Sequence, residues 1–336
     1  MLLAADIGAT KTILALYSSD HEIYTPLAES EFLTSEFPDL ESLVANFLRE
    51  KNATVSSASL GIAAPIKNGQ ATMINMPWVV SEKQLKGALG IARVRLLNDL
   101  EAIAYSVPIL RESDIHTLHK GIPDPKGSIA VIAPGTGLGE AFLIWSETGY
   151  NSYASEGGHT DFAPSNPMEL ELLRYLWTKF DHVSYERVCS GPGIYNIYNF
   201  LKISGKAEEP AWLASELAGS DDPTAVIVNA AKSQERSCRI CEMTVDIFTS
   251  VLGAEAGNLA LKVLSTNGVF IGGGIPPRIL NFLIHGKFMQ LFKNKGRESF
   301  IVSDIPVHVV LNKKAGLLGA AYYGLTYLEK VRANEV

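Results

Sequence analysis

The sequence has few of the features that mark secreted or membrane proteins. Its 336 residues include only three cysteines, an odd number in a chain long enough to fold without disulfides, so a reducing, cytoplasmic environment is expected. No apolar run approaches the roughly 18 residues that a transmembrane helix needs, and the first residues carry no basic leader. We therefore expect neither a signal peptide nor a membrane partner.

Basic residues and metal motifs are also scarce. Lys and Arg total 29 against 36 for Asp and Glu, a net charge of -7 that argues against a nucleic-acid partner. Cys238 and Cys241 have C-x-x-C spacing, but no second pair completes a zinc site, and two cysteines on one side of a helix are expected instead. What is present is a hydrophobic content of 47%, enough for a large core and, at this length, for about two domains.

Strands and helices alternate along the first part of the chain, which predicts the α/β class. Strands are expected at residues 2–6, 12–17, 58–64 and 94–97, and a helix at 40–49. The segment 112–126 contains two prolines and mixed polarity and is expected to be a connecting loop. The domain boundary is placed near residue 110, giving a domain of residues 1–110 and a larger one of residues 111–315.

The second part of the chain begins as the first part does. A strand at 128–133, a glycine turn at 134–139 and a strand at 141–145 repeat the strand, turn and strand of residues 2–17. Two related halves that share one nucleotide would show this recurrence. Helices are expected at 170–180, 194–201 and 241–264, strands at 268–271 and 307–311, and a last apolar helix, 316–330, that completes the first domain.

Three glycine-containing turns can bring backbone N–H groups close to phosphate. In the first, Asp6 at a strand end precedes Gly8-Ala9-Thr10-Lys11; the carboxylate can hold a hydrated Mg²⁺, and Thr10 and Lys11 can meet phosphates. A plain hairpin turn is the alternative. The second turn, residues 134–139, is followed by a strand and is therefore not a dinucleotide fingerprint. The third, Gly272, Gly273 and Gly274, precedes a helix.

Three other segments contain polar residues that can bind the hydroxyl groups of a sugar. Asn98 and Asp99 come at the carboxyl end of a buried strand, where Asp99 can take a proton from a sugar hydroxyl or can simply cap the next helix. Glu156 and His159 flank two glycines, and Glu186 lies in another polar segment. These groups can bind hydroxyls with directional hydrogen bonds, although a lone loop histidine or glutamate is often only a solvated surface residue.

Taken in order, these segments resemble the bacterial glucokinase family, the ATP-dependent group without a zinc motif. The resemblance covers nearly the whole chain. It rests on residues 5–10, 97–102, 134–139, 156–159, 186 with 190–193, 272–278 and 316–319. It implies the two-domain actin-like and hexokinase-like (ribonuclease H-like) α/β fold, with a cleft between a small and a larger domain.

The resemblance also implies the chemistry. The expected reaction is phosphorylation of D-glucose at its 6-hydroxyl by ATP with Mg²⁺, and a homodimer is expected. Asp99 is the expected base. Glucose is expected to bind through Asn98, Asp99, Gly137, Glu156, His159 and Glu186, and ATP through Ala5, Asp6, Ile7, Gly8, Ala9, Thr10, Thr136, Gly137, Gly272, Gly273 and Gly274. Ala9 and Lys11 replace the glycine and asparagine usual in the family's first turn. The alternatives are a kinase for another hexose and a non-catalytic sugar sensor.

Overall fold

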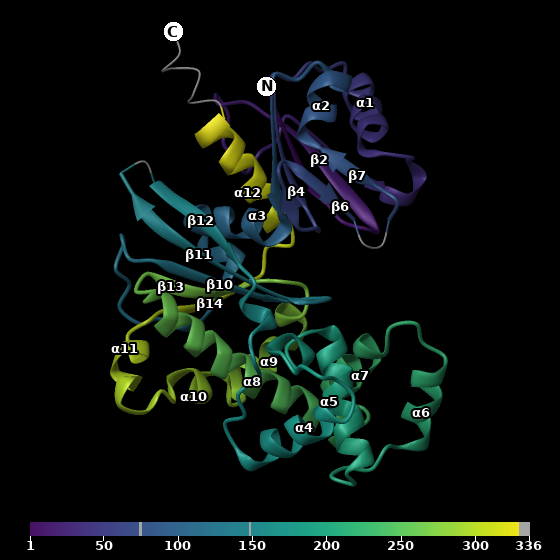
Figure 1. Ribbon diagram of the computed structural model, residues 1–336, viewed down its shortest axis with the longest axis vertical. Helices are drawn as coiled ribbons and strands as arrows, with labels where there is room; N and C mark the ends of the chain where they lie inside the picture. Colours follow the sequence, from purple (N-terminus) through teal and green to yellow (C-terminus); the bar gives the residue numbers. More distant parts are fainter. Residues whose placement is uncertain (74–75, 148, 329–336) are drawn as a thin grey trace. The chain divides into compact units, whose positions relative to one another are not determined.

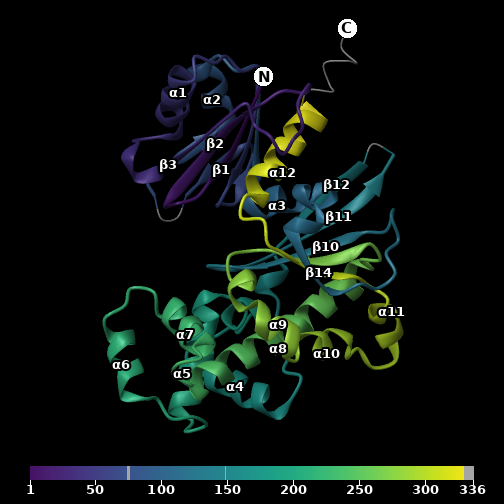
Figure 2. The same cartoon turned by 180° about the vertical axis from the view of Figure 1, so that it is seen from behind.

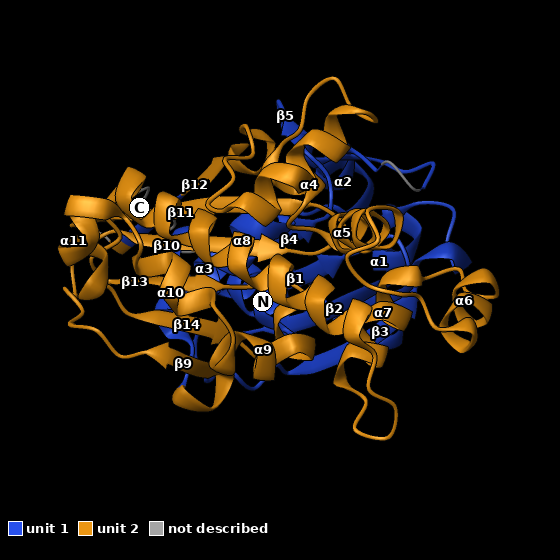
Figure 3. Cartoon of the chain, turned by 90° about the horizontal axis from the view of Figure 1, so that it is seen from below, with its two compact units in different colours: residues 1–111, 150–152, 312–336 blue, residues 112–149, 153–311 orange. Residues whose placement is uncertain are grey.

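The computed structural model describes residues 1–73, 76–147 and 149–328. The described residues divide into two compact units, coloured separately in Figure 3. Unit 1 comprises residues 1–111, 150–152 and the C-terminal residues from 312 onward, and unit 2 comprises residues 112–149 and 153–311. Each unit contains a mixed β-sheet with helices packed against it, as the α/β class predicts (Figures 1 and 2).

Unit 1 is built on a five-stranded sheet with the order β3-β2-β1-β4-β8. Strand β1 is antiparallel to β2 and parallel to β4, which is parallel to β8. A small second sheet has the order β5-β6-β7. The elements are β1 (Leu2–Ile7), β2 (Lys11–Tyr17), β3 (Ala28–Leu33), α1 (Leu40–Glu50), β4 (Ser57–Ile62), β5 (Ile66–Lys67), β6 (Gln70–Thr72), β7 (Val79–Ser81), α2 (Glu82–Leu89), β8 (Arg93–Asn98), α3 (Asp99–Ser106) and α12 (Ala315–Tyr323).

Alternation along β1 decides what each face of this sheet buries. Leu3, Ala5 and Ile7 pack with the apolar sides of α1 and α2, whereas Leu2 and Ala4 pack with α12 on the other face. Because side chains alternate between faces with a period of two, Asp6 belongs to the face that α12 covers. This alternation therefore directs one carboxylate of the first turn toward the C-terminal helix.

Unit 2 contains a six-stranded sheet with the order β12-β11-β10-β13-β14-β9. Helices α4, α5, α7 and α8 contribute to one large core with β10, β13 and β14, and α8 contacts β10 and β13 directly (Figure 1). The elements are β9 (Ile115–His119), β10 (Ile129–Pro134), β11 (Leu138–Ser146), β12 (Gly149–Ser155), α4 (Pro167–Trp177), α5 (Gly191–Ile203), α6 (Ala211–Ala218), α7 (Pro223–Lys232), α8 (Arg239–Val263), β13 (Gly268–Ile271), α9 (Leu280–His285), α10 (Phe288–Lys293), α11 (Ser299–Ser303) and β14 (Val307–Val310).

The recurrence seen in the sequence is a real structural repeat. Both units contain an antiparallel hairpin, β1–β2 or β10–β11, whose first strand also pairs in parallel with a later strand: β1 with β4, and β10 with β13. The sheets accordingly share the order β2-β1-β4-β8 and β11-β10-β13-β14. The glycine turns of residues 8–10 and 135–137 are thus equivalent positions in two related halves.

One local expectation was wrong. The segment 112–126 is not all loop, because Ile115–His119 forms β9 and pairs antiparallel with β14. Its polar residues are tolerated because β9 is an edge strand, which buries little beyond Leu118. The helix expected after Gly272, Gly273 and Gly274 is present; it begins as the 3₁₀ turn Pro276–Ile279 and continues as α9.

The last expected helix is shorter than expected. Regular α-helix ends at Tyr323 and continues as a π-helical turn, Gly324–Leu328. Residues 329 and 330, the end of the expected helix, lie outside the described residues.

Candidate active site

Two carboxylates meet at the carboxyl edge of the sheet in unit 1. Ile7 pairs with Ile62 of β4, and Ile62 pairs with Asn98 of β8, so Asp6 and Asp99 stand at the same end of parallel strands. Their charges influence each other, because Asp99 contributes to raising the pKa of Asp6. The sequence placed these carboxylates 93 positions apart, and the parallel pairing brings them to one edge.

Asp6 lies against the start of α12. A Cβ atom added at Gly316 would stand 3.0 Å from Asp6 Oδ2, so only glycine leaves the carboxylate its present space. Burial, followed by repulsion from Asp99, raises the pKa of Asp6 from 3.8 to about 6, and Lys11 opposes that rise. A cation near Asp6 would relieve the same repulsion.

The first glycine turn is closed by backbone hydrogen bonds. Gly8 N–H donates to the Lys11 carbonyl at 3.0 Å, and the Thr34 hydroxyl donates to the Gly8 carbonyl at 2.9 Å. Ala5 and Ile7 are buried in the core, so only their backbone atoms are available for a phosphate. Lys11 Nζ contacts Glu31 Oε2 at 3.0 Å on the surface, which holds the expected phosphate-binding ammonium group in an ion pair.

Asn98 and Asp99 both cap α3. The Leu100 N–H donates to Asn98 Oδ1 at 3.0 Å and to Asp99 Oδ1 at 2.9 Å. Burial raises the pKa of Asp99 above its usual 3.8, although its hydrogen bonds with Leu100 and Asn98 oppose the rise. Asp99 can therefore both cap the helix and act in catalysis, because Asn98 Oδ1 provides a second acceptor for the Leu100 N–H.

In unit 2 the two remaining glycine turns lie against each other. A Cβ atom at Gly273, whose φ is +86°, would stand 2.4 Å from the Pro134 carbonyl oxygen. Gly272 N–H donates to the Ile132 carbonyl, and Gly191 N–H, at the start of α5, donates to the Gly135 carbonyl, each at 2.8 Å. The turn that contains Thr136 and Gly137 is thus contacted by two backbone segments, one at Gly272 and Gly273 and the other at Gly191.

Three of the expected sugar-binding residues of unit 2, Gly137, His159 and Glu186, gather beside this turn. Glu186 Oε2 accepts a hydrogen bond from Leu138 N–H at 3.0 Å and lies 4.0 Å from His159 Nε2. A Cβ atom at Gly137 would stand 2.5 Å from the same Glu186 oxygen, which is why the position suits glycine. His159 and Glu186 also line a polar pocket of about 350 Å³, together with Lys179, Phe180, Asp181, His182, Ser184 and Arg187.

Glu156 and His159 bracket a 3₁₀ turn, Gly157–His159, in which the His159 N–H donates to the Glu156 carbonyl at 3.0 Å. Both glycines are buried while the Glu156 and His159 side chains are exposed. The turn lies close to β11, because a Cβ atom at Gly158 would be 2.1 Å from the Leu138 carbonyl oxygen. The two glycines therefore present two polar side chains from a rigidly packed turn.

Sequence reasoning missed Gly316 as a neighbour of Asp6 and gave no role to Glu140 or Glu255. Gly316 belongs to a motif, residues 316–319, that supports the family resemblance without indicating a contact with Asp6. The buried position of Glu255 in the middle of α8 carries no signal in the sequence, since glutamate is common on exposed helix faces.

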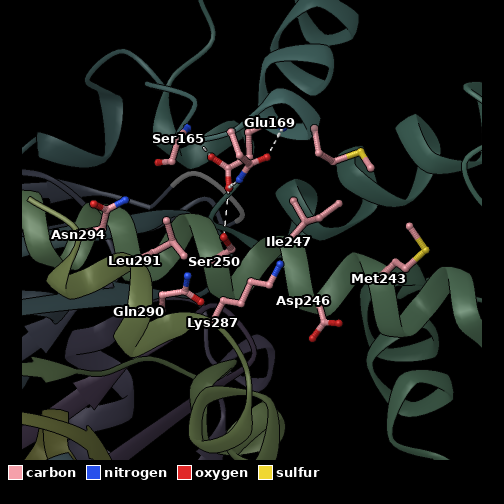
Figure 4. A pocket seen from close by; sticks show the side chains of 12 residues that line it. Ser165, Glu169, Met243, Asp246, Ile247, Ser250, Lys287, Gln290, Leu291 and Asn294 are labelled. Carbon is pink, nitrogen blue, oxygen red and sulfur yellow. Dashed lines mark hydrogen bonds between the residues drawn. The ribbon is translucent and has the colours of Figure 1, made fainter.

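Other features of the described residues lie away from these groups. A pocket of about 400 Å³ is formed by α4, α8 and α10 in unit 2 (Figure 4). Its most buried carboxylate, Glu169, already accepts hydrogen bonds from Ser165 N–H, Asn166 Nδ2 and the Ser250 hydroxyl. The three cysteines are free and buried, with Cys238 as the N-cap of α8 rather than on a helix face.

No three side chains of His, Cys, Asp or Glu in the described residues are grouped to hold a metal by themselves. Within the same residues no helix combines the length and apolarity that crossing a membrane requires.

Comparison with known proteins gives one consistent family. Residues 3–326 match the profile of the Glucokinase family. Curated glucokinases from Nostoc punctiforme and Synechocystis sp. are 41% and 39% identical to the chain; the alignments cover 96% and 95% of it, and 98% and 96% of those proteins.

Solved structures agree in fold. A crystal structure of glucokinase from an Antarctic psychrotroph has a TM-score of 0.83 at 31% identity and covers 96% of this chain and 97% of that one. A ROK family glucokinase from Streptomyces griseus, solved with glucose and AMPPNP, has a TM-score of 0.63 at 19% identity and covers 95% and 97% of the two chains. The chain belongs to the glucokinase family of ATP-dependent sugar kinases, with the actin-like ATPase fold.

Proposed function

We propose that the chain transfers the terminal phosphoryl group of ATP to the 6-hydroxyl of D-glucose, with Asp99 as the general base. The observation that carries this assignment is the placement of Asp99: a carboxylate at the carboxyl end of a parallel strand, whose helix-capping task is shared with Asn98. Its raised pKa makes the ionised carboxylate a stronger proton acceptor for a sugar hydroxyl than an ordinary aspartate.

Glucose is assigned to polar groups from both units. Unit 1 supplies Asn98 and Asp99, and unit 2 supplies Glu156, His159, Glu186 and the backbone of Gly137. Carboxylates and an imidazole suit this task because each sugar hydroxyl both donates and accepts a hydrogen bond. Loss of one such partner leaves a buried polar group unpaired, which discriminates between hexoses more strongly than an apolar contact does.

ATP is assigned to the equivalent glycine turns of the two halves. In unit 1 these are residues 5–10, and in unit 2 Thr136 and Gly137 with Gly272, Gly273 and Gly274. The close backbone packing at Gly273 and the hydrogen-bonded turn at Gly8 support positions at which phosphate oxygens can approach N–H groups without a side chain in the way.

Mg²⁺ fits beside Asp6. The donor set is one carboxylate with Asp99 near it, and burial and repulsion raise the pKa of Asp6 to about 6, so a divalent cation would stabilise the ionised form. A hydrated Mg²⁺ commonly needs only one or two carboxylates in addition to phosphate oxygens. When bound, the ion would neutralise charge on the transferred phosphoryl group, while Asp99 accepts the proton of the attacking hydroxyl.

Three further features complete the proposal: the domain organisation, the cellular environment and the oligomeric state. The chain is assigned a small domain of residues 1–110, completed by the C-terminal helix, and a large domain of residues 111–315, and the division into two compact units supports this assignment. The working environment is the cytoplasm, where ATP is available and the three buried thiols stay reduced. The enzyme acts as a homodimer, an assignment taken from the family resemblance, and binds neither nucleic acid nor membrane.

The sugar assignment is tested with a panel of hexoses. Purified protein with ATP and Mg²⁺ is assayed for ADP release on glucose, mannose, fructose and an N-acetylated hexosamine. Glucose should give the highest kcat/KM and yield glucose 6-phosphate. A higher kcat/KM on another hexose would assign the same chemistry to that sugar, and sugar binding without ADP release would refute the catalytic proposal.

A further inference from the structure

A pair of buried glutamates lies directly beneath the loop that carries Glu156 and His159. Glu140 of β11 and Glu255 of α8 are 1% and 0% exposed. A Cβ atom added at Gly157 would stand 1.9 Å from Glu140 Oε2, so the Glu140 carboxylate is packed against the backbone of that loop. The position of this carboxylate is therefore linked to that of Gly157, which adjoins Glu156.

The two glutamates have unequal surroundings. Glu255 is held by Lys262 Nζ at 3.1 Å and by Asn258 Nδ2 at 2.9 Å. Glu140 Oε1 is buried, and no N–H or O–H group of the described residues donates a hydrogen bond to it. A proton on Glu140 would supply the hydrogen bond that its Oε1 lacks, because two carboxylates can hydrogen-bond to each other only when one is protonated.

The same cluster also supports Glu186. Tyr185, its neighbour, hydrogen-bonds to Glu255 and accepts a hydrogen bond from Asn258 Nδ2 at 3.1 Å. Both turns that carry the proposed glucose ligands of unit 2 therefore rest on one acidic cluster. The other charged or titratable groups that face it are Lys262, Lys295, which binds Asn258 Oδ1 at 2.7 Å, and the buried Cys189 and Glu169.

We propose that Glu140 is a positioning residue for the glucose-binding turn, and that glucose binds most tightly when the Glu140–Glu255 pair holds a proton. This inference rests on the proposed assignment of Glu156, His159 and Glu186 to glucose. With the proton present, Glu140 is neutral and can be buried against Gly157 at low cost. Without it, a second buried negative charge requires a donor or water, and the turn must shift to admit one.

Titration of this proton falls in an accessible range. Burial, and then the negative charge of Glu255, raise the pKa of Glu140 from 4.5 to about 7, while Lys262 opposes the rise. If glucose binding raises the pKa of Glu140 further, the bound state takes up protons and affinity falls as pH rises above about 7. Each unit of difference in pKa between free and bound enzyme gives about a tenfold change in glucose affinity.

The experiment compares wild type with Glu140→Gln, a neutral side chain of the same shape, between about pH 6 and pH 8.5. In the wild type, KM for glucose should rise severalfold across this range while KM for ATP stays constant. In Glu140→Gln, the rise in KM for glucose above pH 7 should be lost, and KM at low pH should stay close to the wild-type value. The matched control is Glu209→Gln, another largely buried glutamate of unit 2, bonded to Tyr198 and Lys202; it should keep the wild-type profile.

Two further measurements keep the proposal testable if Glu140→Gln folds poorly. Glu255→Gln removes the charge that raises the Glu140 pKa, so the rise in KM should begin at a lower pH. Calorimetry of glucose binding to wild type, in two buffers of different ionisation enthalpy, should show uptake of up to about one proton near pH 7.5. A pH-independent KM in wild type, an unchanged profile in both variants, or binding without proton uptake would overturn the proposal.

A wrong assignment of the glucose ligands would give a different result from a wrong role for Glu140. If Glu156→Gln leaves KM for glucose unchanged, the glucose ligands of unit 2 are wrongly assigned, whatever the pH profile shows. If Glu156→Gln raises that KM but Glu140→Gln retains the wild-type pH dependence, the site stands and only the role of Glu140 is refuted.

Discussion

Replacing Asp99 by Asn separates its proposed catalytic role from its structural one. Asn keeps the size of the side chain and an oxygen that can accept from Leu100 N–H, and Asn98 Oδ1 already accepts from the same group at 3.0 Å. Weakening of one of these two hydrogen bonds should therefore reduce stability by less than about 1 kcal/mol. A positioned base contributes about 10²–10⁴-fold in rate, which corresponds to roughly 3–5 kcal/mol of barrier.

We expect kcat for glucose phosphorylation to fall by about 10²–10⁴ in Asp99→Asn, with KM for ATP nearly unchanged. Coupled detection of ADP measures the rate, and thermal unfolding checks the fold. Because the pKa of Asp99 is raised, wild-type activity should decline as pH falls through that pKa, and this decline should disappear from the residual activity of the variant.

The matched control is Asp39→Asn. Asp39 caps α1 in the same unit by accepting from Ser42 N–H at 2.7 Å and has no proposed role in catalysis. It should lose a similar small amount of stability and no turnover. Wild-type kcat in Asp99→Asn, or equal losses of kcat in both variants, would refute the argument that Asp99 is the base.

Three further predictions follow from particular contacts. The raised pKa of Asp6 means that the folded state binds more protons than the unfolded state between pH 3.8 and about 6, so stability falls as pH rises through that window. Asp6→Asn should therefore stabilise the metal-free protein at pH 7 by about 1–3 kcal/mol in thermal unfolding while reducing Mg²⁺-dependent turnover; a lower Tm would contradict this. Glu156→Gln should raise KM for glucose by about tenfold or more and leave KM for ATP unchanged, with the exposed Glu208→Gln as control. Gly273→Ala should lower stability by a few kcal/mol because its Cβ atom meets the Pro134 carbonyl at 2.4 Å, whereas Gly90→Ala, also at positive φ but with open space, should cost only about 1 kcal/mol; equal losses would rule out the contact as the cause.

Much of the fold was predictable because its signals are local. Buried β-strands such as Leu2–Ile7 and Ile129–Pro134 are apolar runs that end in glycine turns, and their recurrence revealed two related halves. The edge strand Ile115–His119 was missed because its pairing with β14 is a long-range contact that leaves no clear period in a partly polar segment. The family assignment needed only the ordered motifs.

What only the tertiary structure decided is which distant residues share an environment. The sequence identified Asp6, Asp99, Glu156, His159 and Glu186 as polar residues at strand ends and turns, because such positions combine exposure with a defined backbone. Parallel pairing placed Asp6 and Asp99 at one sheet edge, where burial and then repulsion from Asp99 raise the pKa of Asp6. Packing of α8 against β10 created the buried Glu140–Glu255 pair. Burial and mutual repulsion depend on what surrounds a side chain in space, and one sequence does not determine those neighbours residue by residue.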